Sequence, residues 1–162
     1  ADQAASAREL LFRYQLLPGN FYCGLSRLHH DMAEMDVALT EAFSANQLAR
    51  REGRSLLCYQ DMGIYQILLP QLRSKSFLEY IRSTRDALLE YDGKYHANLM
   101  ETLQVYIACG GKLAQTAERM FLHVNTVRYR LDKARELLHM DDFFIQAYIF
   151  VKADRFLHPE DE

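Results

Sequence analysis

Near its C-terminal end, the chain shows three helical patterns that follow one another with turns of only a few residues between them. The first covers residues 98–109 and stops at two glycines at 110–111, because glycine tolerates the left-handed backbone just past a helix end. The second pattern covers residues 113–121. The third begins near Asn125 and Thr126, whose side chains can accept hydrogen bonds from the N–H groups of a helix start. Short crossing helices joined by a tight turn predict a helix-turn-helix.

The third of these helices has two contrasting faces. At about 100° per residue, its apolar side chains fall on one side, namely Val124, Val127, Leu131, Ala134 and Leu138. The opposite side carries amide, phenol, ammonium and guanidinium groups, which are able to contact DNA bases and phosphates. These groups belong to Asn125, Tyr129 and Lys133, with Arg128 and Arg130 beside them.

Positive charge is concentrated around the same helices. The whole chain has a formal net charge of −3, but residues 112–136 contain six basic and three acidic residues, a net charge of +3. A basic segment inside an acidic chain is expected where a polyanion binds. The alternative is a solvated basic helix in an all-α bundle, and the pattern alone favours neither.

In a helix-turn-helix, the N-terminal part of the second helix enters the major groove of double-stranded DNA. The candidates for contacts to base edges are then His123, Asn125, Thr126, Arg128 and Tyr129. The candidates for phosphate contacts are Gln115, Thr116, Arg130 and Lys133. The predicted partner is therefore double-stranded DNA, contacted through its major groove.

Upstream of these helices, the pattern alternates between helix and strand. Helices are expected over 3–17, 31–52, 62–69 (stopped by Pro70) and 75–91, and strands over 21–25 and 55–59. Two short strands make a poor sheet and leave edges to be covered. We therefore expect a partial α+β region over residues 1–90, completed by other segments or by a partner, and an all-α helix-turn-helix domain over residues 91–162. The fold class as a whole is mostly α.

The last segment of the chain is apolar nearly all round a helix. It contains Phe143, Phe144, Ile145, Tyr148, Ile149, Phe150, Val151 and Phe156. Such a helix is buried on more than one side. We expect part of its surface to pack on the helix-turn-helix and the rest to form a two-fold interface. The prediction is a homodimer with its recognition helices roughly 34 Å apart.

The sequence shows no signature of catalysis, of a cofactor site or of a metal site. Cys23, Cys58 and Cys109 are widely spaced in apolar surroundings, which is typical of reduced thiols in the cytoplasm. The His, Asp and Glu side chains over residues 29–34 are interpreted as a helix start capped by Asp31, not as metal ligands. Neither a phosphate-binding G-x-x-x-x-G-K-[ST] loop nor a G-x-S-x-G nucleophile turn occurs. We expect a protein that is not an enzyme.

No apolar run approaches the roughly 18 residues that are needed to cross a membrane. The first residues also lack the basic and apolar parts of a signal peptide. The sequence begins without methionine, so we expect a piece of a longer cytoplasmic protein.

Several of these motifs resemble the C-terminal helix-turn-helix of PucR/CdaR-type regulators. They are Glu101-Thr102-Leu103, Tyr106, Gly110-Gly111, Thr116-Ala117-Glu118-Arg119 and the long run His123-Val124-Asn125-Thr126-Val127-Arg128-Tyr129-Arg130-Leu131. Residues 59–63 and 88–92 resemble, more weakly, the end of the degenerate GGDEF-like domain that precedes this motif in the family. The third helix is also similar to that of Fis-like proteins, which bind DNA as dimers. Val124 departs from both patterns, because a basic residue is frequent there; a valine could still contact a thymine methyl group.

The resemblance implies a cytoplasmic, sequence-specific DNA-binding transcriptional regulator whose small-molecule effector acts through a region further N-terminal. It implies that residues 1–90 are the partial GGDEF-like region. The alternative is a ligand-sensing or dimerisation module derived from a degenerate nucleotidyl-cyclase-like domain.

Overall fold

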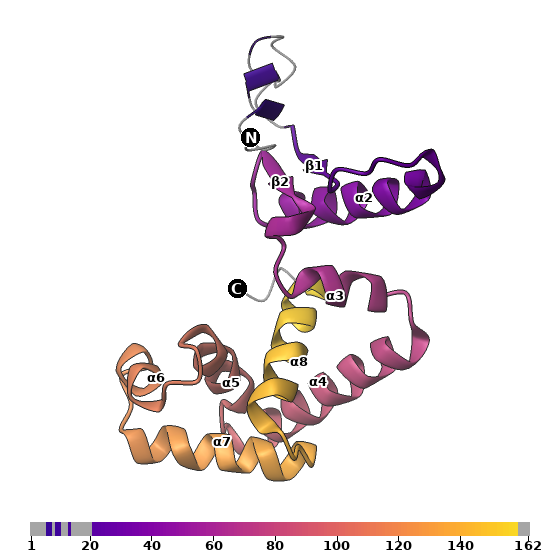
Figure 1. Cartoon of the computed structure of the whole chain (residues 1–162). Helices are drawn as coiled ribbons and strands as arrows, with labels where there is room; N and C mark the ends of the chain where they lie inside the picture. Colours follow the sequence, from indigo (N-terminus) through magenta and orange to yellow (C-terminus); the bar gives the residue numbers. More distant parts are fainter. Residues whose placement is uncertain (1–5, 8, 11–12, 14–20, 159–162) are drawn as a thin grey trace. The chain divides into compact units, whose positions relative to one another are not determined.

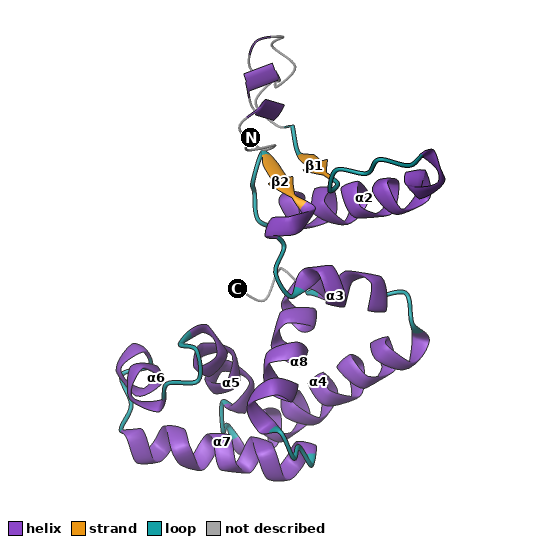
Figure 2. Ribbon diagram, viewed as in Figure 1, coloured by secondary structure: helices purple, strands orange, loops and turns teal. Residues whose placement is uncertain are grey.

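A computed structural model describes residues 6, 7, 9, 10, 13 and 21–158 of the chain (Figure 1). Helices dominate, and strands make only one small sheet in the described residues, as Figure 2 shows. The mostly α fold class is therefore confirmed. Of the helix expected over residues 3–17, the described positions are helical, and the rest lie outside the described residues. The chain divides into two compact units, Ala1–Gln71 and Leu72–Glu162.

The first unit pairs two short parallel strands through a crossover helix. Strand β1 (Cys23–Leu25) lies beside β2 (Leu56–Cys58), with Cys23 opposite Leu56. Parallel neighbours need a long connection, which here contains the 3-10 helix η1 (Met32–Glu34) and helix α2 (Met35–Arg51). A second 3-10 helix, η2 (Tyr59–Asp61), and helix α3 (Tyr65–Gln71) follow. The structure contains the strands and helices expected between residues 21 and 69. The two strands and α2 are slightly shorter than expected, whereas α3 begins and ends later.

Helix α2 lies directly against β1 because position 24 carries no side chain. A Cβ atom on Gly24 would lie 2.2 Å from the Ala42 carbonyl oxygen and 2.2 Å from the Asn46 amide nitrogen, far inside van der Waals contact. The Asn46 side chain also donates a hydrogen bond to the Tyr22 carbonyl at 2.6 Å. The close approach of helix and strand therefore depends on glycine at this position.

Helix α3 corrects one expectation. The sequence predicts that the helix stops before Pro70, yet it continues to Gln71 with the proline inside it. Proline has no N–H to give to the carbonyl four residues back, which here belongs to Gln66. The Tyr59 hydroxyl donates to that carbonyl at 3.4 Å. The substitute donor offsets the lost helical hydrogen bond, and the helix ends two residues later than expected.

An ion-pair cluster around the buried Glu41 fixes the loop after β1 onto α2. Glu41 is 3% exposed, and its carboxylate accepts hydrogen bonds from the Arg27 backbone N–H (2.9 Å) and from Arg27 Nε (2.8 Å). The ring nitrogens of His29 lie 3.0 Å from a Glu41 oxygen and 3.1 Å from a Glu34 oxygen. Burial alone would raise the pKa of Glu41, but the hydrogen bonds from Arg27 and His29 lower it to about 2. The bonds to Glu41 and to Glu34 raise the pKa of His29.

The stability of the first unit should therefore pass through a maximum in mildly acidic solution. The raised pKa means that the protonated His29 ring stabilises the folded unit below about pH 6.5. That stabilisation is lost as the pH rises through the pKa that His29 has in the folded protein. The lowered pKa of Glu41 stabilises the unit above about pH 4.5, and this contribution is lost as the pH falls towards about 2.

Urea unfolding from about pH 3 to about pH 9, followed through the NMR amide signals of β1 and β2, measures this dependence. His29→Gln should remove the alkaline decline in unfolding free energy. His30→Gln, at the exposed neighbouring position, should keep it. An unchanged alkaline decline in the His29→Gln protein would contradict the assignment of that decline to His29.

The second unit is an all-α bundle around α5. Its helices are α4 (Lys75–Tyr95), α5 (Leu99–Ala108), α6 (Leu113–Arg119), α7 (Val124–Leu138) and α8 (Phe143–Leu157). Helix α5 packs against each of the other four, as Figure 1 shows. The fully buried side chains of the core include Leu88, Leu103, Val127 and Phe150.

Helix α4 belongs to this bundle. The sequence predicts that this helix ends at residue 91 and that the second domain begins there, but α4 runs to Tyr95 and packs against α5, α7 and α8. The compact unit accordingly begins at Leu72. At the end of α4, the Asp92 carboxylate accepts hydrogen bonds from the backbone N–H groups of Leu99 (2.7 Å) and Met100 (2.9 Å). It therefore caps the start of α5 from another helix.

Helix α8 buries one side on this bundle. Phe143, Ala147 and Phe150 are buried, whereas Phe144 and Ile145 are 40% and 60% exposed. As expected, one side of α8 packs on the helix-turn-helix domain, where it contacts α5. The two-fold interface expected on its other side stays a prediction.

Candidate nucleic-acid interface

Helices α6 and α7 cross at a tight turn. Helix α6 ends at Arg119, two residues earlier than expected, and α7 begins at Val124. The turn is closed by backbone hydrogen bonds from Phe121 to the Glu118 carbonyl (3.1 Å) and from Leu122 to the Ala117 carbonyl (2.9 Å). This arrangement confirms the predicted helix-turn-helix.

The cap of α7 is His123 and not, as expected, Asn125 or Thr126. Its Nδ1 accepts a hydrogen bond from the backbone N–H of Asn125 at 3.2 Å. The sequence missed this cap because the usual capping side chains carry oxygen, whereas an imidazole nitrogen accepts here. An accepting Nδ1 places the proton of the neutral ring on Nε2, so the exposed His123 ring presents a donor. Asn125 and Thr126 instead lie exposed in the first turn of α7.

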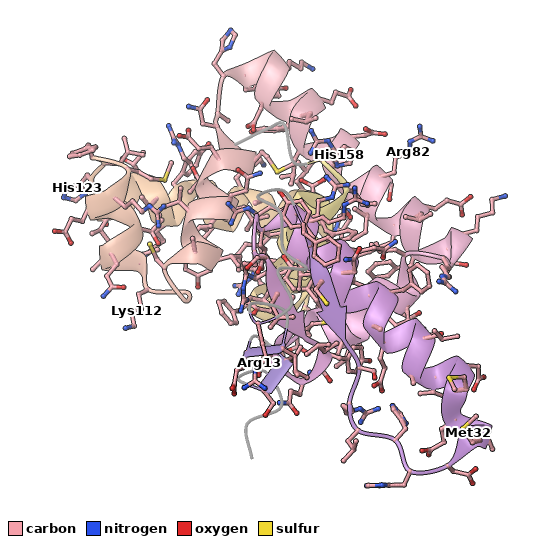
Figure 3. The ribbon with its side chains drawn as sticks, turned by 90° about the horizontal axis from the view of Figure 1, so that it is seen from above. Arg13, Met32, Arg82, Lys112, His123 and His158 are labelled. Carbon is pink, nitrogen blue, oxygen red and sulfur yellow. The ribbon has the colours of Figure 1, made fainter. Side chains whose placement is uncertain are left out.

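The inner face of α7 is apolar, as predicted. Val127, Leu131 and Ala134 are buried in the core, and Val124 and Leu138 pack against it. The first half of the outer face and the start of α6 remain exposed, with the candidate residues Gln115, His123, Asn125, Thr126, Arg128 and Tyr129. Figure 3 shows His123 and Lys112 at one end of the unit, well separated from Arg82 and His158. Six of the nine candidates are therefore exposed on α6, on α7 or in the turn between them.

Thr116 does not lie on that surface. Its side chain is fully buried, and its hydroxyl donates to the Lys112 carbonyl at 2.9 Å. Threonine commonly bonds to the carbonyl four residues back in a helix, which satisfies the hydroxyl and allows the side chain to be buried. The expectation that this side chain contacts phosphate is therefore corrected.

Arg130 and Lys133 are engaged by other parts of the unit. Arg130 Nη1 donates to the Thr102 hydroxyl at 3.2 Å, which ties α7 to α5. Lys133 Nζ lies 3.0 Å from the Glu136 carboxylate and 5.9 Å from the centre of the Tyr91 ring. The hydrogen bond and charge of Glu136 raise the pKa of Lys133. A phosphate contact from either side chain, which stays a prediction, would have to share or break these interactions.

Lys112 was not among the predicted site residues, although its charge was counted. It is the N-cap residue of α6, and it is exposed. The glycine pair at 110–111 has positive φ angles of +63° and +77° and forms the turn before α6. The next helix begins directly after this turn, so the glycine pair in the sequence could have identified Lys112 as a residue at the edge of the candidate surface.

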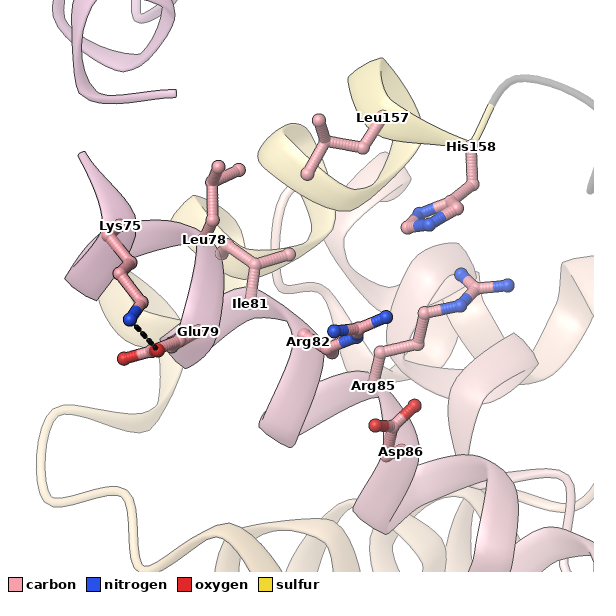
Figure 4. Close-up of a pocket in the computed structure, with 9 residues that line it drawn as sticks. All are labelled: Lys75, Leu78, Glu79, Ile81, Arg82, Arg85, Asp86, Leu157 and His158. Carbon is pink, nitrogen blue, oxygen red and sulfur yellow. Dashed lines mark ion pairs between the residues drawn. The ribbon is translucent and has the colours of Figure 1, made fainter. Parts of the chain in front are cut away.

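The second unit also holds an open cleft of about 640 Å³ along α4 and the end of α8 (Figure 4). Two of its cationic side chains pair with carboxylates. Lys75 lies 3.7 Å from Glu79, and Arg85 Nη1 donates to both oxygens of Asp154, at 3.0 and 2.9 Å. We therefore interpret these two ion pairs as stabilising the fold.

In the described residues, no group of three or more His, Cys, Asp or Glu side chains is placed to hold a metal ion. Among the helices of residues 21–158, none has the length and apolar character needed to span a membrane.

Comparison with protein families places the helix-turn-helix in a known class. Residues 99–142 match the PucR C-terminal helix-turn-helix domain. The second unit therefore contains a helix-turn-helix domain that is similar to the C-terminal domain of PucR-type regulators, as the sequence motifs indicated.

Three relatives from Bacillus subtilis (strain 168) match a larger part of the chain. The proline-responsive transcriptional activator PutR is 26% identical over 145 residues, the purine catabolism regulatory protein 31% over 117 residues, and the DNA-binding transcriptional activator AdeR 23% over 117 residues. These matches cover 86%, 71% and 70% of this chain, but only 35%, 22% and 28% of the relatives. The chain therefore spans about a third or less of the length of these relatives. No solved structure matches it.

Proposed function

We propose that this chain is the C-terminal part of a sequence-specific transcriptional regulator that inserts the first half of α7 into the major groove of DNA. The observation that carries the proposal is the outward surface of the helix-turn-helix. Its candidate side chains are exposed, while the opposite side of the same helix is buried in the core. The match of residues 99–142 to the PucR C-terminal helix-turn-helix domain supports a role of this unit in DNA binding.

The surface side chains divide by their chemistry into two roles. The Asn125 amide offers a donor and an acceptor that fit an adenine edge, and the Arg128 guanidinium fits either a guanine edge or a phosphate. Thr126 and Tyr129 add hydroxyl groups, and both are exposed in the first two turns of α7. Lys112 and Gln115, near the start of α6, would contact phosphates that flank the groove.

A salt series measures the electrostatic part of this proposal. We expect a labelled duplex of about 30 base pairs to bind with a steep dependence on salt, because each phosphate contact releases counterions. Arg128→Ala should make the slope of log affinity against log salt shallower by about 1. Fluorescence anisotropy measures both quantities.

Arg82→Ala is the matched control. Arg82 is an exposed arginine of the same unit, but it lies on α4 beside the cleft. The Arg82→Ala change should leave the slope of log affinity against log salt unchanged. Equal slopes for the parent, Arg128→Ala and Arg82→Ala proteins would contradict the placement of α7 against DNA.

Assembly and regulation are further parts of the proposal. We infer a cytoplasmic homodimer, since two recognition helices roughly 34 Å apart would read a two-fold operator; a monomeric mass in sedimentation would contradict it. The name of one relative states that it responds to proline. By analogy, we propose that a small-molecule effector acts on this protein through a region N-terminal to the chain.

A further inference from the structure

Phe121 occupies an unusual position in the turn between α6 and α7. Its side chain is 96% exposed, which is the highest value for a large apolar side chain in the described residues. Its backbone has a φ of +55°, in the left-handed region that glycine favours and bulky residues avoid. An aromatic residue is therefore unfavourable here on two counts, backbone conformation and solvation.

The folded unit gains little from this side chain. The turn is closed by backbone atoms, through the bonds from Phe121 N–H to the Glu118 carbonyl and from Leu122 N–H to the Ala117 carbonyl. The apolar contacts of the turn come from its neighbours, since Ala117 is buried in the core and Leu122 packs against it. Glycine at position 121 could close the same turn without exposing a ring.

Phe121 lies close in the sequence to the residues of the proposed DNA-binding surface. Phe121 lies two residues before the α7 cap His123, and the exposed Asn125 and Thr126 follow within the first turn of α7. DNA offers apolar surface at the edge of its major groove in the thymine methyl group and the deoxyribose ring, and phenylalanine is among the side chains that contact thymine methyls.

We propose that Phe121 is a DNA-contacting residue whose ring packs against a thymine methyl group or a deoxyribose at the edge of the groove that receives α7. The proposal rests on the proposed function and adds an apolar contact to its polar ones. Association with DNA would cover the aromatic surface that folding leaves in water. The favourable contact in the complex would then offset the unfavourable left-handed backbone of the unbound protein.

Tryptophan fluorescence tests the placement of the ring directly. The chain contains no tryptophan, so Phe121→Trp introduces a single reporter. We expect its emission to change when duplex DNA is added at low salt, and to saturate together with the anisotropy of the labelled duplex. Tyr80→Trp, at an exposed position of α4, should show no change. Unchanged emission of Phe121→Trp at saturating DNA would overturn the proposal.

A glycine variant separates binding from folding. Phe121→Gly should weaken DNA binding by about 5- to 10-fold, the lower part of the range for a good groove contact. Its thermal unfolding temperature should not fall, because glycine suits the backbone conformation. If the weakening disappears on a duplex with uracil in place of thymine, the contact is to the methyl group; equal weakening on both duplexes assigns it to deoxyribose.

The Arg128→Ala protein distinguishes a failure of the role proposed for Phe121 from a failure of the proposed DNA-binding function. If Phe121→Gly binds DNA like the parent while Arg128→Ala weakens binding, the role of Phe121 is overturned and the proposed function stands. If neither change affects binding, the proposed function itself fails.

Discussion

Asn125→Ala is expected to lower the affinity for a selected operator by about 30-fold, while the affinity for a random duplex stays within about 2-fold. A bidentate contact between an asparagine amide and an adenine edge is worth about 1–3 kcal/mol of discrimination. Asn125 lies exposed in the first turn of α7. Its backbone N–H is held by His123 Nδ1, which fixes the direction of that turn.

Selection from a random duplex library supplies the operator, and anisotropy with the selected and the random duplex measures both affinities. Gln47→Ala is the control, since Gln47 carries the same amide group at an exposed position of α2 and should change neither affinity. Equal losses on the two duplexes would show that Asn125 contacts the DNA backbone. No loss on either would show that this turn does not read bases.

Arg85→Met is expected to lower the free energy of unfolding of the second unit by about 3 kcal/mol, the order found when one partner of a buried ion pair is removed. Asp154 is 1% exposed and holds α8 to α4 through the two bonds from Arg85 Nη1. His158 Nδ1, 3.1 Å away, is a further partner of this carboxylate. Without Arg85, the buried carboxylate loses both of the hydrogen bonds that hold it to α4.

Urea denaturation of the whole chain, followed through amide signals of α5 and α8, measures this loss. Arg82→Met removes an exposed arginine of the same helix and should cost less than about 0.5 kcal/mol. The double change Arg85→Met and Asp154→Leu should recover most of the loss, because it removes both charges. A similar effect of Arg85→Met and Arg82→Met would contradict the structural role of the ion pair.

Periodicity predicted the parts of the fold that depend on one helix at a time. The apolar spacing of Val127, Leu131 and Ala134 was enough to identify the buried face of α7. The glycine pair at 110–111 was enough to end α5, because its left-handed backbone follows from glycine itself. The crossing of α6 and α7 then followed from the short turn between them.

Interactions between helices could not be predicted in this way. A helical pattern shows which face of α4 is apolar but not which helices cover it, so the packing of α4 on α5, α7 and α8 was missed. The pattern places Arg130 and Lys133 on the polar side of α7, but not their bonds to Thr102 and Glu136. Thr116 was misplaced because a polar side chain can be satisfied inside its own helix.

Amide chemical-shift mapping tests the central claim most directly. A duplex of about 30 base pairs is added to the ¹⁵N-labelled chain at low salt, where phosphate contacts are strongest. The account predicts that the shifted signals cluster at the start of α6, in the turn at Phe121 and in residues 123–129. Shifts that cluster instead in the first unit, between β1 and α3, with α6 and α7 unchanged, would contradict it.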